Sequence, residues 1–123
     1  MNKILELDKI SQLLADFAYS RDWEKFHSAK NLSMAVANEA GELLEIFQWL
    51  TEKQSNDIKN NPELKTKVEH EIADIMLYLI RLATRLDIDL NSALYNKIEL
   101  NNQKYPVEKV KGSAKKYDEY PQD

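Results

Sequence analysis

The stretch NEAGELLEIFQWL, residues 38–50, combines the apolar periodicity of a helix with glutamates at every third position, Glu39, Glu42 and Glu45. On a helical wheel of about 100° per residue, the apolar side chains share one arc: Leu32, Val36, Leu43, Ile46 and Leu50. Glu39 falls inside that arc, Glu42 lies at its edge, and Glu45 is nearer the solvent side. Acids on the buried face of a core helix require an explanation, because an unpaired buried carboxylate is costly.

A second helical stretch, EHEIADIMLYLIRL at residues 69–82, repeats the arrangement. Its apolar arc consists of Leu64, Val68, Ile75, Tyr78, Leu82 and Leu86. Glu71 falls in the middle of this arc and Asp74 at its edge. Because both acid pairs are spaced i, i+3, each pair projects from a single face of its helix. The two helices therefore each offer two carboxylates to a common apolar interface.

Four carboxylates facing one another would repel and destabilise the fold unless a cation lay between them. The chain has no cysteine, so a metal must be held by oxygen or histidine, and oxygen ligands suit Mg²⁺ or Mn²⁺. Mg²⁺ commonly shares its ligand shell with substrate phosphates. One E-x-x-E pair is common on solvated helices, but two pairs on apolar arcs favour a metal site. Gly41, between two of the acids, would permit close approach of a metal, a ligand or another helix.

The chain is the size of one domain, with 123 residues, and has only 2 glycines and 3 prolines, which favours helices over tight turns. The patterns predict helices at about 4–19, 28–52, 62–86 and 89–103. Asn61 is the expected N-cap of the third helix, with Pro62 at its first position. Residues 20–31 form a predicted connector, and residues 51–61 a polar turn. We expect an all-α four-helix bundle over residues 1–106 and a polar, partly basic tail over residues 107–123.

The formal net charge is −4, which argues against a stable complex with nucleic acid. The sequence contains neither the apolar run of a signal peptide nor a membrane span, so we expect a cytoplasmic protein without membrane association.

Five stretches together resemble a known family: RDWEKFH at 21–27, NEAGELLEIFQW at 38–49, EIADIMLYL at 71–79, NNQKYP at 101–106 and KGSAKKY at 111–117. The chain is similar to the all-α nucleoside triphosphate pyrophosphohydrolases of the MazG-like superfamily, most closely to the short dCTP pyrophosphatase branch. This resemblance implies cleavage of a (deoxy)nucleoside triphosphate between its α- and β-phosphates, which cleanses the nucleotide pool. It also implies a homodimer or homotetramer with the active site between subunits.

The resemblance assigns roles to individual residues. The residues that it implies as Mg²⁺ ligands are Glu39, Glu42, Glu71 and Asp74. The residues that it implies as contacts of the nucleotide are Trp23, His27, Trp49 and Tyr78, with Lys97, Asn101 and Lys104 facing the phosphates. A carboxylate that is not used as a ligand can serve as the general base for water, and Glu42 and Glu45 are the candidates.

One departure concerns the base. The dCTP-preferring branch carries a histidine nine residues before the tryptophan of RDW, and this chain has Leu14 there. The preferred base therefore stays open, between dCTP and another or a modified nucleotide.

Two other functions would also use acids on helices. A carboxylate-bridged di-iron bundle needs E-x-x-H on two helices, and only Glu24 and His27 have that spacing. A non-catalytic oligomerisation or regulatory module, with acids paired to lysines across an interface, remains the main alternative.

Overall fold

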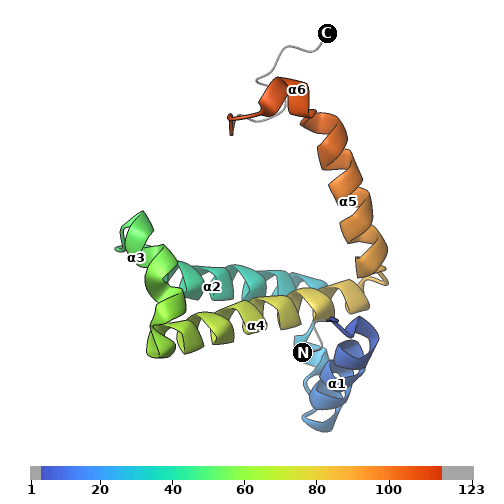
Figure 1. Cartoon of the computed structure of the whole chain (residues 1–123). Helices are drawn as coiled ribbons and strands as arrows, with labels where there is room; N and C mark the ends of the chain where they lie inside the picture. Colours follow the sequence, from blue (N-terminus) through green and yellow to red (C-terminus); the bar gives the residue numbers. More distant parts are fainter. Residues whose placement is uncertain (1–3, 115–123) are drawn as a thin grey trace. The chain divides into compact units, whose positions relative to one another are not determined.

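The computed structural model describes residues 4–114, and over this range its regular structure is entirely helical (Figure 1). The α-helices are α1 (Leu7–Ser20), α2 (Ala29–Phe47), α3 (Glu52–Asp57), α4 (Pro62–Arg85), α5 (Leu90–Lys104) and α6 (Val107–Val110). Two 3₁₀ turns, Glu24–Phe26 and Ile58–Asn60, lie between them. The all-α prediction is confirmed.

The chain divides into two compact units, Met1–Ile88 and Asp89–Asp123. In the first unit, α2 and α4 run antiparallel and side by side, joined by α3 and the second 3₁₀ turn, while α1 packs against α4 (Figure 1). Leu32 on α2 and Ile80 and Ala83 on α4 are buried, as is Ala18 on α1. The helical hairpin of α2 and α4 therefore supplies both the core and the facing surfaces that carry the acids.

Side-chain caps fix where the helices begin. Ser28 accepts a hydrogen bond from the backbone N–H of Asn31 at the start of α2, and Asn61 accepts one from Leu64 at the start of α4. Asp89 caps α5 in the same way, through Ser92. The predicted cap at Asn61, with Pro62 at the first helical position, is confirmed.

The prediction of a polar turn over residues 51–61 was wrong. Thr51 and Gln54 form a capping box, in which the Thr51 side chain accepts from the Gln54 backbone and the Gln54 side chain accepts from the Thr51 backbone. This pairing satisfies two backbone donors and starts α3. The second helix consequently ends at Phe47 rather than near residue 52.

The four long helices of the predicted bundle are all present, with α3 and α6 as short additions. The short α6 begins directly after Pro106, within the segment predicted to be a tail. The rest of that segment, residues 115–123, lies outside the described residues. Among the described residues, no helix combines the length and the apolar character that crossing a membrane requires.

Candidate active site

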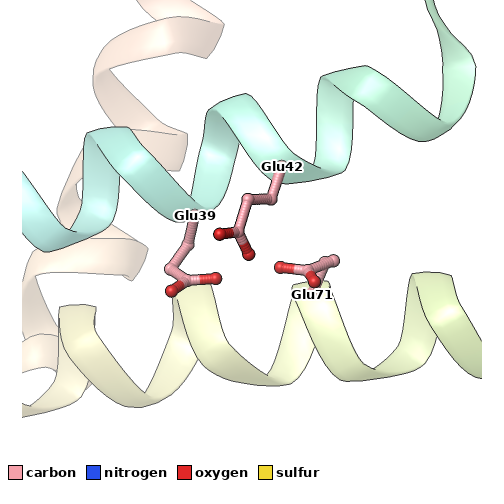
Figure 2. Close-up of side chains that lie close together, drawn as sticks. All are labelled: Glu39, Glu42 and Glu71. Carbon is pink, nitrogen blue, oxygen red and sulfur yellow. The ribbon is translucent and has the colours of Figure 1, made fainter.

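Three carboxylates meet between the two helices of the hairpin. Glu39 and Glu42 project from α2 toward Glu71 on α4 (Figure 2), and one oxygen from each lies within 4.8 Å of the others. Glu39 and Glu71 are half-buried, whereas Glu42 is exposed. This follows from their wheel positions, because Glu39 and Glu71 occupy the centres of the facing arcs and Glu42 an edge. We call these three residues the carboxylate group.

The carboxylate group brings like charges together on a partly buried surface. The Oε2 atoms of Glu39 and Glu71 are buried and have no hydrogen-bond partner. Burial, followed by hydrogen bonds with Glu71 and Glu42 and by the charges of Glu42 and Asp74, raises the pKa of Glu39 from 4.5 to about 7. A divalent cation would satisfy the orphaned oxygens and remove the repulsion. The all-oxygen donor set fits a hard ion such as Mg²⁺ or Mn²⁺.

Two further acids among the predicted site residues lie outside the carboxylate group. Asp74 is exposed on α4, and its charge contributes to the raised pKa of Glu39. Glu45 is exposed on α2, one turn after Glu42. Asp74 is therefore close enough to act on the group electrostatically, while Glu45 remains available for another role.

A cavity of about 500 Å³ opens beside Asp74, between α1, the segment that follows it and α4. Its lining consists of Ile10, Leu13, Leu14, Phe17, Trp23, His27, Asp74, Leu77, Tyr78 and Arg81. Three of the predicted nucleotide contacts, Trp23, His27 and Tyr78, thus share one space. The lining is mainly apolar and aromatic, which is typical of small-molecule sites.

The C-terminal turn of α1 sets the position of Trp23. The backbone N–H of Trp23 donates to the Ala18 carbonyl at 2.8 Å, and that of Asp22 donates to Tyr19 at 3.1 Å. With Asp22 at a φ of 53°, these two bonds form a Schellman motif. The Trp23 ring then meets Phe17 edge to face, with centroids 5.7 Å apart. The motif therefore brings the RDW tryptophan into the cavity wall.

Arg81 is the site residue that the sequence analysis missed. It is only 5% exposed, and its Nε donates a hydrogen bond to Nδ1 of His27 at 3.4 Å. Burial, and then the charges of Arg81 and Arg85, lower the pKa of His27. A signal was present, since Arg81 lies about 20° from Asp74 on the helical wheel, at the edge of the apolar arc. A charged side chain on an apolar arc of the helical wheel is the same signal that identified the acids, and it identifies this arginine as well.

Other predicted site residues lie outside both the carboxylate group and the cavity. Trp49 follows α2 and is 85% exposed. Lys97, Asn101 and Lys104 lie on α5 in the second unit, which is described by itself, so their role toward phosphates stays a prediction. Leu14 lines the cavity. It contributes an apolar surface at the position where the dCTP-preferring branch carries a histidine.

In the part of the chain that the structure describes, helices place carboxylates between α2 and α4, beside an aromatic cavity, as the resemblance to MazG-like enzymes leads us to expect. The MazG-like family model matches residues 34–120. Rat dCTP pyrophosphatase 1 is 40% identical over 115 residues, which cover 94% of this chain and 68% of the rat protein. The human protein of the same name is 38% identical over the same coverage.

A solved structure agrees with these relatives. A pyrophosphatase from Archaeoglobus fulgidus superposes with a TM-score of 0.76 at 34% identity, covering 86% of this chain and 97% of the archaeal one. The chain therefore belongs to the MazG-like family. It is a homologue of the dCTP pyrophosphatases, within the class of nucleoside triphosphate pyrophosphatases. The predicted family and enzyme class are confirmed.

Proposed function

We propose that this protein is a Mg²⁺-dependent pyrophosphohydrolase that converts a (deoxy)nucleoside triphosphate, with dCTP or a modified nucleotide as candidates, to the monophosphate and pyrophosphate. The observation that carries the proposal is the carboxylate group, with oxygens from three acids within 4.8 Å of one another, in a chain 40% identical to a dCTP pyrophosphatase. An adjoining cavity of about 500 Å³ supports a nucleotide-sized ligand.

Glu39, Glu42, Glu71 and Asp74 are the proposed ligands of the cation. The orphaned oxygens of Glu39 and Glu71 support this assignment, because a buried carboxylate oxygen without a partner is unfavourable unless a cation or donor satisfies it. When bound, Mg²⁺ neutralises triphosphate charge and polarises the phosphorus under attack, and Mn²⁺ is a plausible substitute.

A carboxylate of this chain is proposed to activate the attacking water by accepting its proton. A water molecule adds to the α-phosphorus, the bond from that phosphorus to the bridging oxygen breaks, and pyrophosphate leaves. Glu45 accepts the water proton, because it lies outside the carboxylate group and is not needed as a ligand; Glu42 is the alternative base if three acids suffice for the cation. The raised pKa of Glu39 leaves part of the population protonated near neutral pH, and binding of a cation would displace that proton.

The cavity is the proposed site of the base. Trp23 and Tyr78 supply aromatic surface, and His27 supplies a ring nitrogen beside them. Lys97, Asn101 and Lys104 are proposed to face the phosphates, where two positive charges and an amide would offset the charge of the triphosphate.

Self-association, as a homodimer or homotetramer, completes the proposal. Large apolar side chains on and after α2 are open to solvent in one copy, including Met34 at 59%, Leu44 at 60% and Trp49 at 85%. Contact with another copy would remove this apolar surface from water. In such an assembly Trp49 would be covered, and it is proposed to enclose the nucleotide of a neighbouring copy.

The test is product analysis on ribo- and deoxynucleoside triphosphates with Mg²⁺, for the parent protein and for Glu39→Gln and Asp74→Asn. We expect monophosphate and pyrophosphate from the parent, and at least about a hundredfold less from both variants, because each removes a charged ligand. Glu69→Gln, an exposed acid on α4 outside the site, is the matched control and should retain activity.

Two outcomes would contradict the proposal. Release of diphosphate and orthophosphate would place the cleavage at the wrong bond. No turnover with any nucleotide, together with correctly folded variants and no thermal stabilisation by Mg²⁺, would favour the non-catalytic module in which acids pair with lysines between subunits.

A further inference from the structure

The cavity contains a buried positive charge that the proposed chemistry does not use. Arg81 lines it, is only 5% exposed, and has an Nη2 atom without a hydrogen-bond partner. Its Nε is already directed at His27. Guanidinium groups only donate hydrogen bonds, and a buried donor left unmatched is unfavourable. A ligand that enters the cavity therefore encounters one unsatisfied donor in a largely apolar wall.

The position of Arg81 along α4 indicates which part of a nucleotide it would meet. Arg81 lies ten residues after Glu71 and seven after Asp74 on the same helix. These separations correspond to about 15 Å and about 10 Å along the helix axis. If the phosphates are held at the acids, as the proposed function requires, the opposite end of the nucleotide reaches Arg81. That end is the base.

We propose that Arg81 determines base specificity, with Nη2 donating a hydrogen bond to an exocyclic carbonyl oxygen of the base. Cytosine, uracil, thymine and guanine each carry such an oxygen. Adenine carries no carbonyl: its exocyclic amino group is a donor and cannot accept from Arg81, and its acceptors are ring nitrogens only. The enzyme should therefore discriminate against dATP. This inference rests on the proposed function, because it uses the phosphates to orient the nucleotide.

His27 acts as the positioning residue for this arginine. Its Nδ1 accepts from Arg81 Nε, so in the neutral ring the proton is on Nε2. The lowered pKa of His27 is consistent with a neutral ring. A site that hydrogen-bonds its substrate discriminates strongly against an analogue without the matching group, because the buried donor of the protein is then left unpaired. An apolar pocket discriminates less between such analogues.

The test compares Arg81→Met with Arg85→Met, which removes an exposed guanidinium one turn later on the same helix. The substrates are the natural deoxynucleoside triphosphates, plus dITP and its analogue built on unsubstituted purine, in which hydrogen replaces O6 and N1 consequently carries no proton. For the parent, we expect kcat/KM for dITP to exceed that for the analogue by about tenfold or more. In Arg81→Met the ratio should fall to within about twofold of one, and in Arg85→Met it should match the parent.

Folding is checked by thermal unfolding, and Arg81→Met should be neutral or stabilising because methionine replaces a buried charge that lacks a full set of partners. A uniform loss of kcat/KM across all substrates in Arg81→Met, with ratios unchanged, would overturn the proposal and assign Arg81 to packing or to phosphate binding. An unchanged ratio at full activity would overturn it as well.

Binding separates this inference from the proposed function. Calorimetric titration with dIMP and with the monophosphate of the O6-deleted analogue measures base recognition without turnover. If the parent hydrolyses nothing yet prefers dIMP, and Arg81→Met abolishes that preference, the reaction assignment fails while the role of Arg81 stands. Equal affinity of the parent for both monophosphates would overturn the role of Arg81, whatever the enzymatic result.

Discussion

The carboxylate group and the cavity both place charge on a buried surface of the same helical hairpin, but with opposite sign. Three acids share one small volume between α2 and α4, and Glu39 carries a raised pKa as a result. In the cavity, Arg81 is a single cation that directs one nitrogen at His27 and leaves Nη2 unmatched. A cation would offset the charge of the first region, while the second offers a hydrogen-bond donor to an acceptor on a ligand.

This difference matches the two ends of one ligand. A triphosphate brings negative charge together with a divalent cation, and a base brings carbonyl oxygens on an uncharged ring. Asp74 connects the two regions, because it lines the cavity and also acts on Glu39. Substitutions in the carboxylate group should therefore affect metal dependence, and substitutions in the cavity other than at Asp74 should affect nucleotide recognition alone.

The largest expected effect comes from Glu71→Gln. Removing a central charge from the carboxylate group should lower kcat/KM by more than about a thousandfold, equivalent to about 4 kcal/mol of transition-state stabilisation. Without metal, the same variant should unfold at a higher temperature than the parent, because the repulsion is reduced. Thermal unfolding with EDTA and with Mg²⁺, run beside the activity assay, measures both.

Glu69→Gln, two residues earlier on the exposed side of α4, is the control and should change neither quantity. The parent should be stabilised by about 2.7 kcal/mol when Mg²⁺ is present at a hundred times its dissociation constant. If Glu71→Gln retained that full stabilisation, the cation would have to bind elsewhere.

The next effect in size concerns how the stability of the metal-free protein depends on pH. The pKa of Glu39 rises from 4.5 to about 7 on folding, so the folded state binds more protons than the unfolded state between these values. The free energy of unfolding should therefore decrease as pH rises through this window, by well under about 3 kcal/mol because solvent screens a carboxylate that is only half-buried. Urea unfolding at a series of pH values with EDTA measures the change.

Two comparisons isolate this contribution. His27 has a lowered pKa and acts in the opposite direction near its ordinary value of 6.5, so the informative quantity is the parent minus Glu39→Gln. Saturating Mg²⁺ should abolish the decrease, because the cation competes with the proton for the carboxylates. A difference curve that stays flat in EDTA would show that Glu39 titrates normally.

Trp23→Ala tests the cavity with a smaller expected effect. Loss of the aromatic surface should lower kcat/KM about tenfold for every nucleotide, in keeping with about 1–3 kcal/mol for stacking of a base on an aromatic side chain. Stabilisation by Mg²⁺ should not change. Steady-state kinetics and thermal unfolding with Mg²⁺ are the measurements, and loss of the metal effect would mean that the two regions are not separable.

Trp49→Ala is the companion variant. Trp49 is 85% exposed in one copy, so its removal should have no effect on a monomer. A loss of activity comparable to that of Trp23→Ala, in a protein that sediments as a dimer or tetramer, would support a site completed by a neighbouring copy.

Most of the carboxylate group was predictable from sequence, because a helical period of about 3.6 residues fixes which side chains share a face. Glu39 and Glu71, at the arc centres, are half-buried, and Glu42 and Asp74, at the edges, are exposed. Leu86 is the exception. It belongs to the apolar arc, but it is the C-cap of α4 and 51% exposed, because the helix ends there.

The cavity was only partly predictable. Trp23, His27 and Tyr78 were identified through family resemblance, and the residues themselves left their role ambiguous. Arg81 was overlooked within an apolar run, and the contribution of Phe17 depends on how α1 packs on α4, which local periodicity does not encode. The helix α3 was missed although its signal, a threonine followed three residues later by glutamine, is present in the sequence.

The smallest expected effect concerns Gly41, in the interior of α2 between two members of the carboxylate group. A Cβ atom built at this glycine meets nothing within 4 Å, so a single copy gives no steric reason for it. Gly41→Ala should then stabilise the isolated chain by about 1 kcal/mol, the ordinary difference in helix propensity. If another copy or the nucleotide packs closely on this face, the added methyl group should instead weaken self-association or raise KM. Urea unfolding and sedimentation of the same variant distinguish the two cases: a more stable protein with unchanged assembly and kinetics would show that close approach at Gly41 is not required.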